Sequence, residues 1–242
     1  MVKRVLLTGA SSGLGKAIAR HLRKLEFEIT GVSRNSIDSS EFDSSVSWLT
    51  ADLSESSEIA RVAELVSSQS FDVAIHCLGG GLGMHNPSLS IDDFDALMRI
   101  NFFAAYHINN ALIESMKVSK KGWIVHLDSI ATREITASLG YTCAKSLIRP
   151  YVKHLGRSLI EDNVFLSSIQ LGAMTGEGGA MDRLKVRNSY QHEEFVKRRR
   201  PSKRMTPNYE IMPYLDLLMS PSARLHAGNT LVLDESELQS IY

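Results

Sequence analysis

The chain alternates short apolar runs with longer stretches of helical periodicity, and this order constrains its fold more than any other feature. Such alternation predicts strands joined by helical crossovers, and therefore an α/β fold with a doubly wound parallel sheet covered by helices on both faces. The predicted strands are 4–8, 28–33, 46–50, 73–78, 123–128, 165–171 and 230–233. The predicted helices are 13–25, 55–68, 92–116, 141–160 and 208–219. Ligands of such sheets bind beyond the carboxyl ends of the strands.

The length and composition suit one globular domain, which we place at 1–242. Lys and Arg together number 27, as do Asp and Glu, so no net charge favours nucleic acid or an anionic membrane as partner. Two cysteines cannot build a disulfide framework, and no apolar run approaches the roughly 20 residues of a membrane span. The first apolar run is also too short for a signal peptide. A cytoplasmic protein is expected.

Two segments lack a clear period. The stretch 35–45 is rich in Ser and Asp and is predicted to be a loop. The stretch 174–207 mixes glycines with a basic cluster. Long segments of this kind in a compact domain are often lids or binding elements, so we expect a substrate-side loop or lid here.

A glycine-rich turn, TGASSGLG at 8–15, follows the first strand and opens the first helix. Glycines permit a tight turn and close approach of a pyrophosphate, which the helix N-terminus attracts. A phosphate-binding P-loop is excluded, because Ala10 occupies its first glycine position and Ala17 offers no hydroxyl to magnesium. The turn therefore predicts a Rossmann-type dinucleotide site. The expected cofactor-binding residues in it are Gly9, Ser11, Ser12, Gly13, Leu14 and Gly15.

Tyr141 and Lys145 are spaced so that both side chains project from one face of a predicted helix. A cation beside a phenol favours the phenolate, so the Tyr can donate and recover a proton more easily near neutral pH. In isolation the pair is better explained as a helix-surface contact. Beside a dinucleotide site it predicts proton transfer to a carbonyl oxygen as hydride reaches the carbon.

The Thr-Gly-x-x-x-Gly-x-Gly turn together with Tyr-x-x-x-Lys resembles the short-chain dehydrogenase/reductase family, over nearly the whole chain from Val5 to Asp234. The resemblance implies a catalytic group of Asn101, Ser129, Tyr141 and Lys145. Tyr141 would be the general acid in reduction and the general base in oxidation. Lys145 would lower its pKa and bind the nicotinamide ribose, Ser129 would position the carbonyl, and Asn101 would complete a proton relay.

The resemblance also implies further cofactor contacts. Asp52 matches an adenine-contacting acid, although a helix cap is an alternative. Gly79 matches a close approach of backbone to cofactor, and Thr175 a contact to the nicotinamide carboxamide. Leu53 and Gly172 complete the expected set of cofactor-binding residues.

The chain departs from the family pattern at several positions. His76 and Cys77 stand where two asparagines are usual, so the hydrogen bonds of those asparagines must be made differently. Leu171 replaces a proline, and Glu-Ser at 235–236 replaces Gly-Gly. Asp128 precedes Ser129 where Ser or Thr is common, and we favour a structural role over one that raises the Tyr141 pKa.

Two further asparagines, Asn109 and Asn110, are expected at a surface or interface.

The end of the second strand predicts NADP(H) rather than NAD(H) as cofactor. An acid at this position would bind the adenosine ribose hydroxyls, but none is present. Ser33 and Arg34 can instead bind a 2′-phosphate, Arg34 by charge-assisted hydrogen bonds. The alternative is that Arg34 is a solvated loop residue. No metal is expected.

The basic segment 197–204, KRRRPSKR, lies on the expected substrate side. One interpretation is a site for an anionic substrate, such as a nucleotide sugar, a CoA thioester or an acyl-carrier protein. A solvated helix face or a subunit contact is the favoured alternative.

The sequence as a whole predicts an NADP(H)-dependent oxidoreductase that interconverts a carbonyl and a secondary alcohol of a small-molecule substrate. The alternatives are a 3-oxoacyl-acyl-carrier-protein reductase, a sugar-modifying oxidoreductase of surface-glycan biosynthesis, and a non-catalytic dinucleotide-binding sensor. Family resemblance implies a homo-dimer or homo-tetramer. The substrate itself does not follow from the residues.

Overall fold

The computed structural model describes residues 3–35, 42 and 44–240. Most of the loop predicted at 35–45 therefore lies outside the described residues. Among the described residues, the strands and helices follow the predicted alternation closely. The strands are β1 (Arg4–Thr8), β2 (Glu28–Ser33), β3 (Val46–Thr50), β4 (Val73–His76), β5 (Gly122–Ser129), β6 (Val164–Leu171), β7 (Met174–Thr175), β8 (Thr206–Pro207) and β9 (Thr230–Leu233). The α-helices are α1 (Gly13–Lys24), α2 (Ser56–Ser67), α3 (Ile91–Met98), α4 (Ala104–Ser119), α5 (Leu139–Ser146), α6 (Ile148–Leu159), α7 (Ala180–Arg187), α8 (Ser189–Arg199) and α9 (Met212–Leu218).

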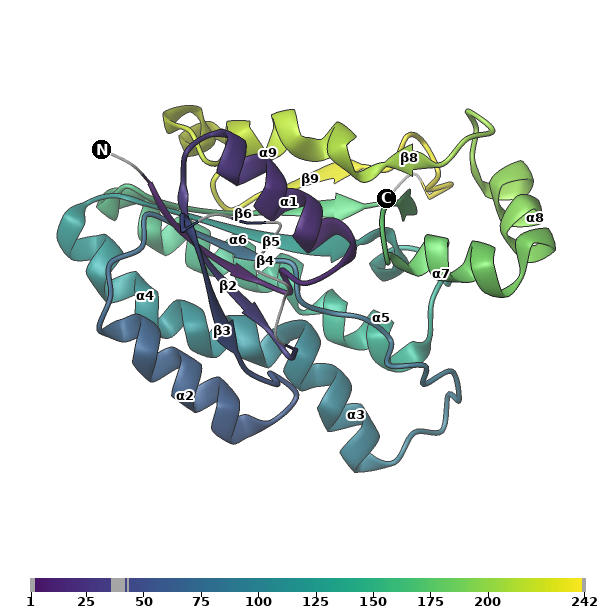
Figure 1. Ribbon diagram of the computed structural model, residues 1–242, viewed down its shortest axis with the longest axis horizontal. Helices are drawn as coiled ribbons and strands as arrows, with labels where there is room; N and C mark the ends of the chain where they lie inside the picture. The colour runs from purple at the N-terminus through teal and green to yellow at the C-terminus, as the bar shows by residue number, and fades with distance from the viewer. Residues whose placement is uncertain (1–2, 36–41, 43, 241–242) are drawn as a thin grey trace.

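Seven of the described strands form a parallel sheet in the order β3-β2-β1-β4-β5-β6-β9 (Figure 1). The order runs outward from β1 in both directions. The crevice beyond the carboxyl ends of β1 and β4 is therefore the switch point at which doubly wound sheets bind ligands. This confirms the predicted single-domain Rossmann-type fold.

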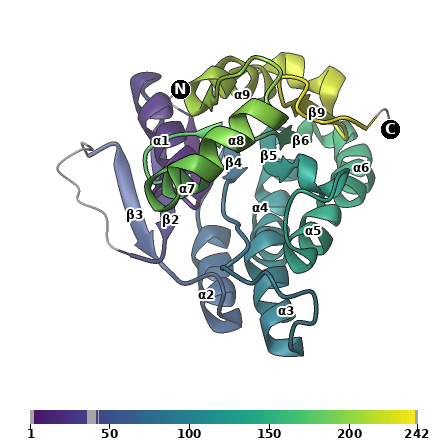
Figure 2. The same ribbon diagram turned by 90° about the vertical axis from the view of Figure 1, so that its right-hand side faces the viewer.

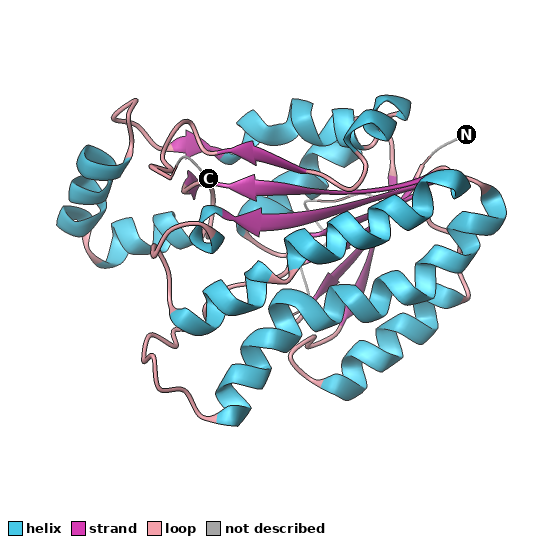
Figure 3. Cartoon of the chain, turned by 180° about the vertical axis from the view of Figure 1, so that it is seen from behind, coloured by secondary structure: helices cyan, strands magenta, loops and turns pink. Residues whose placement is uncertain are grey.

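Helices cover both faces of the sheet, as Figure 3 shows from behind. Successive residues of a strand point to opposite faces, so Val5 and Leu7 pack with α1 and α9 on one side. Leu6, between them, packs with α2, α4 and α6 on the other. Each central strand is thus buried on both faces, which explains its continuous apolar sequence.

The helix predicted at 92–116 is broken in the structure. A π-helical turn at Arg99–Phe103 separates α3 from α4. Such turns widen a helix locally and are frequent at functional sites. The helix predicted at 141–160 is broken as well, between α5 and α6, because Pro150 has no N–H to bond the carbonyl of Ser146.

The segment 174–207 is more ordered than its sequence indicated. It contains α7 and α8 between the short paired strands β7 and β8, and both helices lie beyond the carboxyl edge of the large sheet (Figures 1 and 2). No residue of α7 or α8 is fully buried, so neither helix needs a strong apolar stripe, and the helical period is weak.

Within the part of the chain that is described, no helix has the length and apolarity needed to cross a bilayer.

Candidate active site

The turn between β1 and α1 leaves its backbone open because glycines stand where a side chain would collide. A Cβ on Gly15 would lie 2.0 Å from the carbonyl oxygen of Gly9, and one on Gly9 would lie 2.8 Å from the Cα of Leu78. Gly9 and Gly13 also have φ angles of 72° and 54°, which glycine adopts without steric cost. A phosphate can therefore approach the N-terminus of α1 closely.

A cleft of about 400 Å³ joins this turn to the expected catalytic residues. Ser129 enters it from the end of β5, and Tyr141 and Lys145 enter it from α5. The other expected site residues that line it are Gly9, Ser11, Ser12, Gly13, Leu14, Gly15, Ser33, Arg34, Gly79 and Gly172. Residues far apart in sequence thus meet at the carboxyl edge of the sheet.

The hydroxyl of Tyr141 is hydrogen-bonded to Ser129 and largely removed from water. This burial raises the pKa of Tyr141 to about 12; the Ser129 hydrogen bond opposes the rise, and the charges of Asp128 and Cys77 add to it. Lys145 does not produce the lowering of this pKa that we expected. Tyr141 is therefore a neutral phenol, and hence a proton donor, at neutral pH.

Lys145 and Asn101 hold the backbone on which the cleft is built. The buried Lys145 ammonium donates to the Leu127 carbonyl at 2.8 Å. Asn101, in the π-helical turn, donates to the Gly80 carbonyl at 3.0 Å and accepts from the Gly80 N–H at 2.9 Å. A Cβ on Gly79 would lie 2.6 Å from Asn101 Oδ1 and 3.1 Å from Lys145 Nζ. Any residue with a side chain would therefore collide with these two groups, and only glycine fits.

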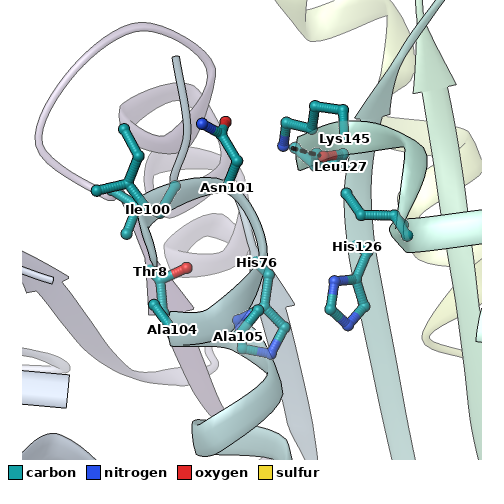
Figure 4. Close-up of a pocket in the computed structure, with 11 residues that line it drawn as sticks. Thr8, His76, Ile100, Asn101, Ala104, Ala105, His126, Leu127 and Lys145 are labelled. Atoms are coloured by element: carbon teal, nitrogen blue, oxygen red, sulfur yellow. Dashed lines mark hydrogen bonds between the residues drawn. The ribbon is translucent and has the colours of Figure 1, made fainter. Parts of the chain in front are cut away.

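Burial lowers the pKa of Lys145, while the charges of Asp128 and Cys77 raise it. Asn101 is not a lining residue of the large cleft. Asn101 and Lys145 instead line a small neighbouring cavity (Figure 4).

His76 finds a partner that the sequence did not reveal. Its Nε2 lies 2.8 Å from Asn109 Oδ1. Asn109, which we expected at a surface or interface, is instead fully buried, because its amide joins three polar side chains inside the fold. Asn110 is exposed. Cys77 lines the cleft, and burial raises the pKa of its thiol to about 12.

Asp128 is buried beside Ser129 and also lines the cleft. Its Oδ1 accepts from the Ser129 N–H at 2.7 Å, and its Oδ2 lies 3.5 Å from Gln170 Nε2. Burial raises the pKa of Asp128 to about 6, although Lys145 and the Ser129 hydrogen bond oppose the rise. Asp128 thus has the structural role that we favoured, and it also raises the pKa of Tyr141.

The end of β2 places Ser33 and Arg34 at the edge of the cleft. Asp52 does not line it. The Asp52 carboxylate accepts from both N–H and hydroxyl of Ser54, at 3.0 and 2.7 Å. Burial alone would raise its pKa, but these bonds and the charge of Arg34 hold the pKa below its ordinary value. Leu53 packs in the core on the α2 side. The adenine contacts of Asp52 and Leu53 stay predictions.

Only part of the loop after β6 lines the cleft. Gly172 lines it, but Thr175 lines a neighbouring groove of about 700 Å³ instead. The Thr175 hydroxyl donates to Asp182, so its oxygen keeps lone pairs with which to accept a hydrogen bond. Thr175 can therefore still accept from a carboxamide, although its donor capacity is used.

The segment 176–180 packs directly on the glycine turn, a contact that the sequence did not indicate. The Glu177 carbonyl accepts from the Gly13 N–H at 2.8 Å. The Glu177 carboxylate pairs with Lys16 and Arg20 on α1, at 3.2 and 2.9 Å. Arg183 of α7 lines the cleft as well. The start of the 174–207 segment therefore covers the turn.

The basic segment 197–204 is neutralised from within the chain. Arg200 is fully buried and pairs with Glu235 and with Glu237, the latter at 2.7 Å. The other arginines pair with carboxylates too: Arg198 with Glu194, Arg199 with Glu134, and Arg204 with Glu210. Arg199 and Arg200 hold the segment to distant parts of the chain, whereas Arg198 pairs within α8. The predicted anion site is therefore not made by these arginines.

The Arg200 network also explains the departure at 235–236. Glu235 and Ser236 have φ angles of 54° and 58°, where glycine is favoured over residues with a side chain. The ion pairs of Glu235 hold it in this conformation in place of the usual glycine.

Comparison with known proteins gives the same fold and a family. The chain is 24% identical over 197 residues to an uncharacterized oxidoreductase of Staphylococcus aureus, covering 76% of this chain and 85% of that protein. Its structure resembles a 4-hydroxyisoleucine dehydrogenase complexed with NADH, with a TM-score of 0.88, 21% identity and coverage of 98% and 99% of the two chains. It also resembles L-sorbose reductase from Gluconobacter frateurii, complexed with NADPH and L-sorbose, with a TM-score of 0.86, 22% identity and coverage of 99% and 98%.

The family model described as short chain dehydrogenase matches residues 3–184, well over half of the sequence. The matched region contains the glycine turn, the π-helical turn and the Ser129, Tyr141 and Lys145 positions. This chain therefore belongs to the short chain dehydrogenase family.

Proposed function

We propose that this protein is an NADP(H)-dependent oxidoreductase that interconverts a carbonyl and a secondary alcohol. One observation carries the proposal: Ser129, Tyr141 and Lys145 line the same cleft as the glycine turn. A group that delivers a proton to an oxygen thus stands beside a backbone that accepts a pyrophosphate.

The residues of the cleft fit a dinucleotide along its length. The glycine turn is tight enough that a Cβ on Gly9 or Gly15 would collide with backbone, and its N–H groups would receive the pyrophosphate. Ser33 and Arg34 would bind the adenosine ribose and its 2′-phosphate, and Tyr141 and Lys145 mark the nicotinamide end. Arg183 adds a positive charge from α7 on the lid side. The bound nucleotide would supply the hydride.

The proton chemistry falls to Tyr141. In reduction its hydroxyl donates a proton to the carbonyl oxygen, which Ser129 holds by a hydrogen bond. In oxidation the phenolate takes that proton back. A pKa of about 12 keeps Tyr141 protonated near neutral pH, which is the form that reduction requires.

The substrate would enter from the groove beside Thr175, under the 174–207 lid. Lys185, Lys197 and Lys203 line this groove together with the apolar Val196 and Met205. Since the arginines of the basic segment are engaged in ion pairs, and Lys197 pairs with Glu194 at 3.9 Å, Lys185 and Lys203 are the cations of this groove that would meet an anionic group. This lining favours a carbonyl substrate with both an apolar part and an anionic part, such as a carrier- or nucleotide-linked compound.

The assembly is proposed to be a homo-dimer or homo-tetramer in the cytoplasm. Phe103 and Tyr106 are exposed at the start of α4, and a second copy would cover them. Size-exclusion chromatography with light scattering would detect a monomer, which would contradict this.

The decisive experiment is a screen of carbonyl compounds with NADPH and with NADH, on the wild type and on Tyr141→Phe. Loss of the general acid should lower kcat by about 10²–10⁴-fold, while the NADPH dissociation constant stays the same. Tyr209→Phe, at an exposed tyrosine, is the matched control. Unchanged turnover in Tyr141→Phe would refute the mechanism. Tight NADPH binding without reduction of any compound would favour a sensor.

A further inference from the structure

A second large pocket lies outside the catalytic cleft, between α6, the 3-10 turn Ile130–Thr132 and the start of β9. Its volume is about 610 Å³, within the usual range of small-molecule sites. The described residues that line it are all different from those that line the cleft of the glycine turn. We call it the α6 pocket. Its polar lining residues are Thr132, Ser146, Arg149, Lys153, Asn229 and Thr230.

The α6 pocket carries positive charge that the chain does not compensate. α6 contains Arg149, Lys153 and Arg157 and no acidic residue. Arg149 and Lys153 are four residues apart, so they lie on one face of the helix and repel each other. The Lys153 ammonium donates to the neutral Asn229 Oδ1 at 3.0 Å, and among the described residues neither cation forms an ion pair. An anion in the pocket would remove their repulsion.

The other surface helices treat their cations differently. In α2, α4 and α8 an exposed cation pairs with a glutamate three or four residues away: Arg61 with Glu58, Lys117 with Glu114 and Arg198 with Glu194. α6 departs from this pattern at both of the positions that line the pocket. A solvated basic face accounts for Arg157, which does not line it. Arg149 and Lys153 instead face polar groups of another part of the chain across an open space.

Thr132 connects the α6 pocket to the catalytic strand. Its hydroxyl donates to the Ser129 carbonyl at 3.0 Å and accepts from Gln170 Nε2 at 2.7 Å. Gln170 Nε2 also donates to the Ser129 carbonyl at 3.2 Å. Arg149 acts through space as well: burial raises the pKa of Asp128, and the charge of Arg149 is among the influences that oppose the rise. An occupant of the pocket would therefore contact the residues that support Ser129 from behind.

We propose that the α6 pocket is a binding site for a small-molecule anion, whose phosphate or carboxylate oxygens accept hydrogen bonds from Arg149 and Lys153. One helical turn separates the two side chains, so one anionic group, or two neighbouring groups of one molecule, can accept from both. Hydride transfer uses none of the pocket's lining residues. The inference therefore assigns a second site and goes beyond the proposed function.

The test titrates the protein, without cofactor, with inorganic phosphate and separately with citrate. Constant ionic strength is needed, because salt screens exposed charges. In nitrogen-15 NMR, the backbone amides of Asn229 and Thr230 should shift until the site saturates. Arg149→Met and Lys153→Met should each raise the dissociation constant at least about tenfold. Arg157→Met, on the same helix but outside the pocket, should leave it unchanged. The tighter of the two anions identifies the preferred chemistry, phosphate or carboxylate.

The glycine turn is the competing place for the same anions, and the spectra separate the two sites. Binding there would shift the amides of Gly13 and Leu14, and it would weaken in Arg183→Met, which removes a cation of the cofactor cleft. The α6 site should be indifferent to Arg183→Met. Shifts confined to the glycine turn would overturn the proposal. So would equal losses in Arg157→Met and Arg149→Met, since the attraction would then be that of a basic helix in general.

A contact between subunits is the competing explanation of the two unpaired cations. Light scattering in anion-free buffer should give the same molar mass for the wild type, Arg149→Met and Lys153→Met. A change of mass in either variant would assign the cations to the assembly and refute the proposal. None of these readouts needs turnover. Failure of the carbonyl screen would therefore leave the α6 site standing, and failure of anion binding would leave the proposed reaction standing.

Discussion

The two sides of the cleft are built in opposite ways. The cofactor side, from β1 to α5, is shaped by what its residues lack: Gly9, Gly15 and Gly79 leave space where any side chain would collide. The substrate side, 174–207, is shaped by long-range ion pairs, above all those of the buried Arg200. The first side depends on glycines that leave room for neighbouring atoms. The second depends on ion pairs with residues more than thirty positions away.

This difference has a physical reason. A pyrophosphate is recognised by backbone N–H groups and a helix dipole, which demand glycines at a fixed local spacing. A lid that is largely exposed buries little apolar surface, so it needs other interactions to hold it in place. Here charged side chains supply them. The two sides meet at Glu237, which pairs with Arg200 and also accepts from the Ala173 N–H beside Gly172, at 2.7 Å each.

The largest expected effect comes from breaking the substrate side. Arg200→Met leaves the buried Glu237 carboxylate without its cation, which should cost about 3–5 kcal/mol of unfolding free energy. Urea unfolding measures it. Arg198→Met is the control: that ion pair with Glu194 is 79% exposed on the arginine side, and its loss should cost at most about 0.5 kcal/mol. Equal effects of the two variants would contradict a structural role for Arg200.

The next effect concerns the buried carboxyl of Asp128, near the end of β5. Burial raises the pKa of Asp128 from 3.8 to about 6, so between pH 4 and 6 the folded state binds more protons than the unfolded state. Stability should therefore fall as pH rises through this window, by roughly 2–3 kcal/mol. Asp128→Asn should abolish this fall, and the exposed Asp95→Asn should retain it. Thermal unfolding between pH 4 and 7 measures this change in stability. If stability depended on pH in the same way in the wild type and in Asp128→Asn, the pKa of Asp128 would not be raised.

A third variant breaks the cofactor side. Gly15→Ala places a Cβ 2.0 Å from the Gly9 carbonyl oxygen, so the turn must shift away from its phosphate-binding geometry. NADPH affinity, measured by fluorescence titration, should fall about 10- to 100-fold. Gly81→Ala is the comparison, because its Cβ would make an ordinary contact 3.6 Å from Ser138 Oγ. If both variants bound NADPH as the wild type does, the turn would not be the pyrophosphate site.

The smallest effect should be a gain in stability. Ser236 is exposed and has a φ of 58°, so Ser236→Gly relieves the steric cost of the left-handed conformation and should stabilise the fold by about 0.5–1 kcal/mol. Ser68→Gly, at a φ of −82°, should instead destabilise it slightly. A loss of stability in Ser236→Gly would show that Ser236 is not strained.

Much of the cofactor side was predictable from local patterns. β1, β2, β3 and β9 begin and end at the predicted residues, because each is a short run rich in β-branched and other apolar residues. The glycine turn and the Tyr141–Lys145 pair were predictable for a similar reason, because each is defined by spacing within a few residues.

Features that depend on distant partners were not predictable. The sequence indicates that Asn109 lies in a helix, but it does not indicate that His76 and His126 contact its amide, so its burial was not predicted. The same holds for Arg200, which reads as one of several basic residues until Glu235 and Glu237 are brought beside it. The pKa of Tyr141 also differs from our expectation, because helical spacing indicates a neighbouring cation but not the burial that raises this pKa.

The sequence by itself determined the α/β alternation, the glycine turn and the spacing of Tyr141 and Lys145. Each of these rests on backbone periodicity or on spacing within one element. Only the tertiary structure decided which charges are neutralised, which polar groups are buried and how the lid meets the turn. Those outcomes depend on desolvation and on contacts between residues far apart in the chain, and neither is written in any local pattern.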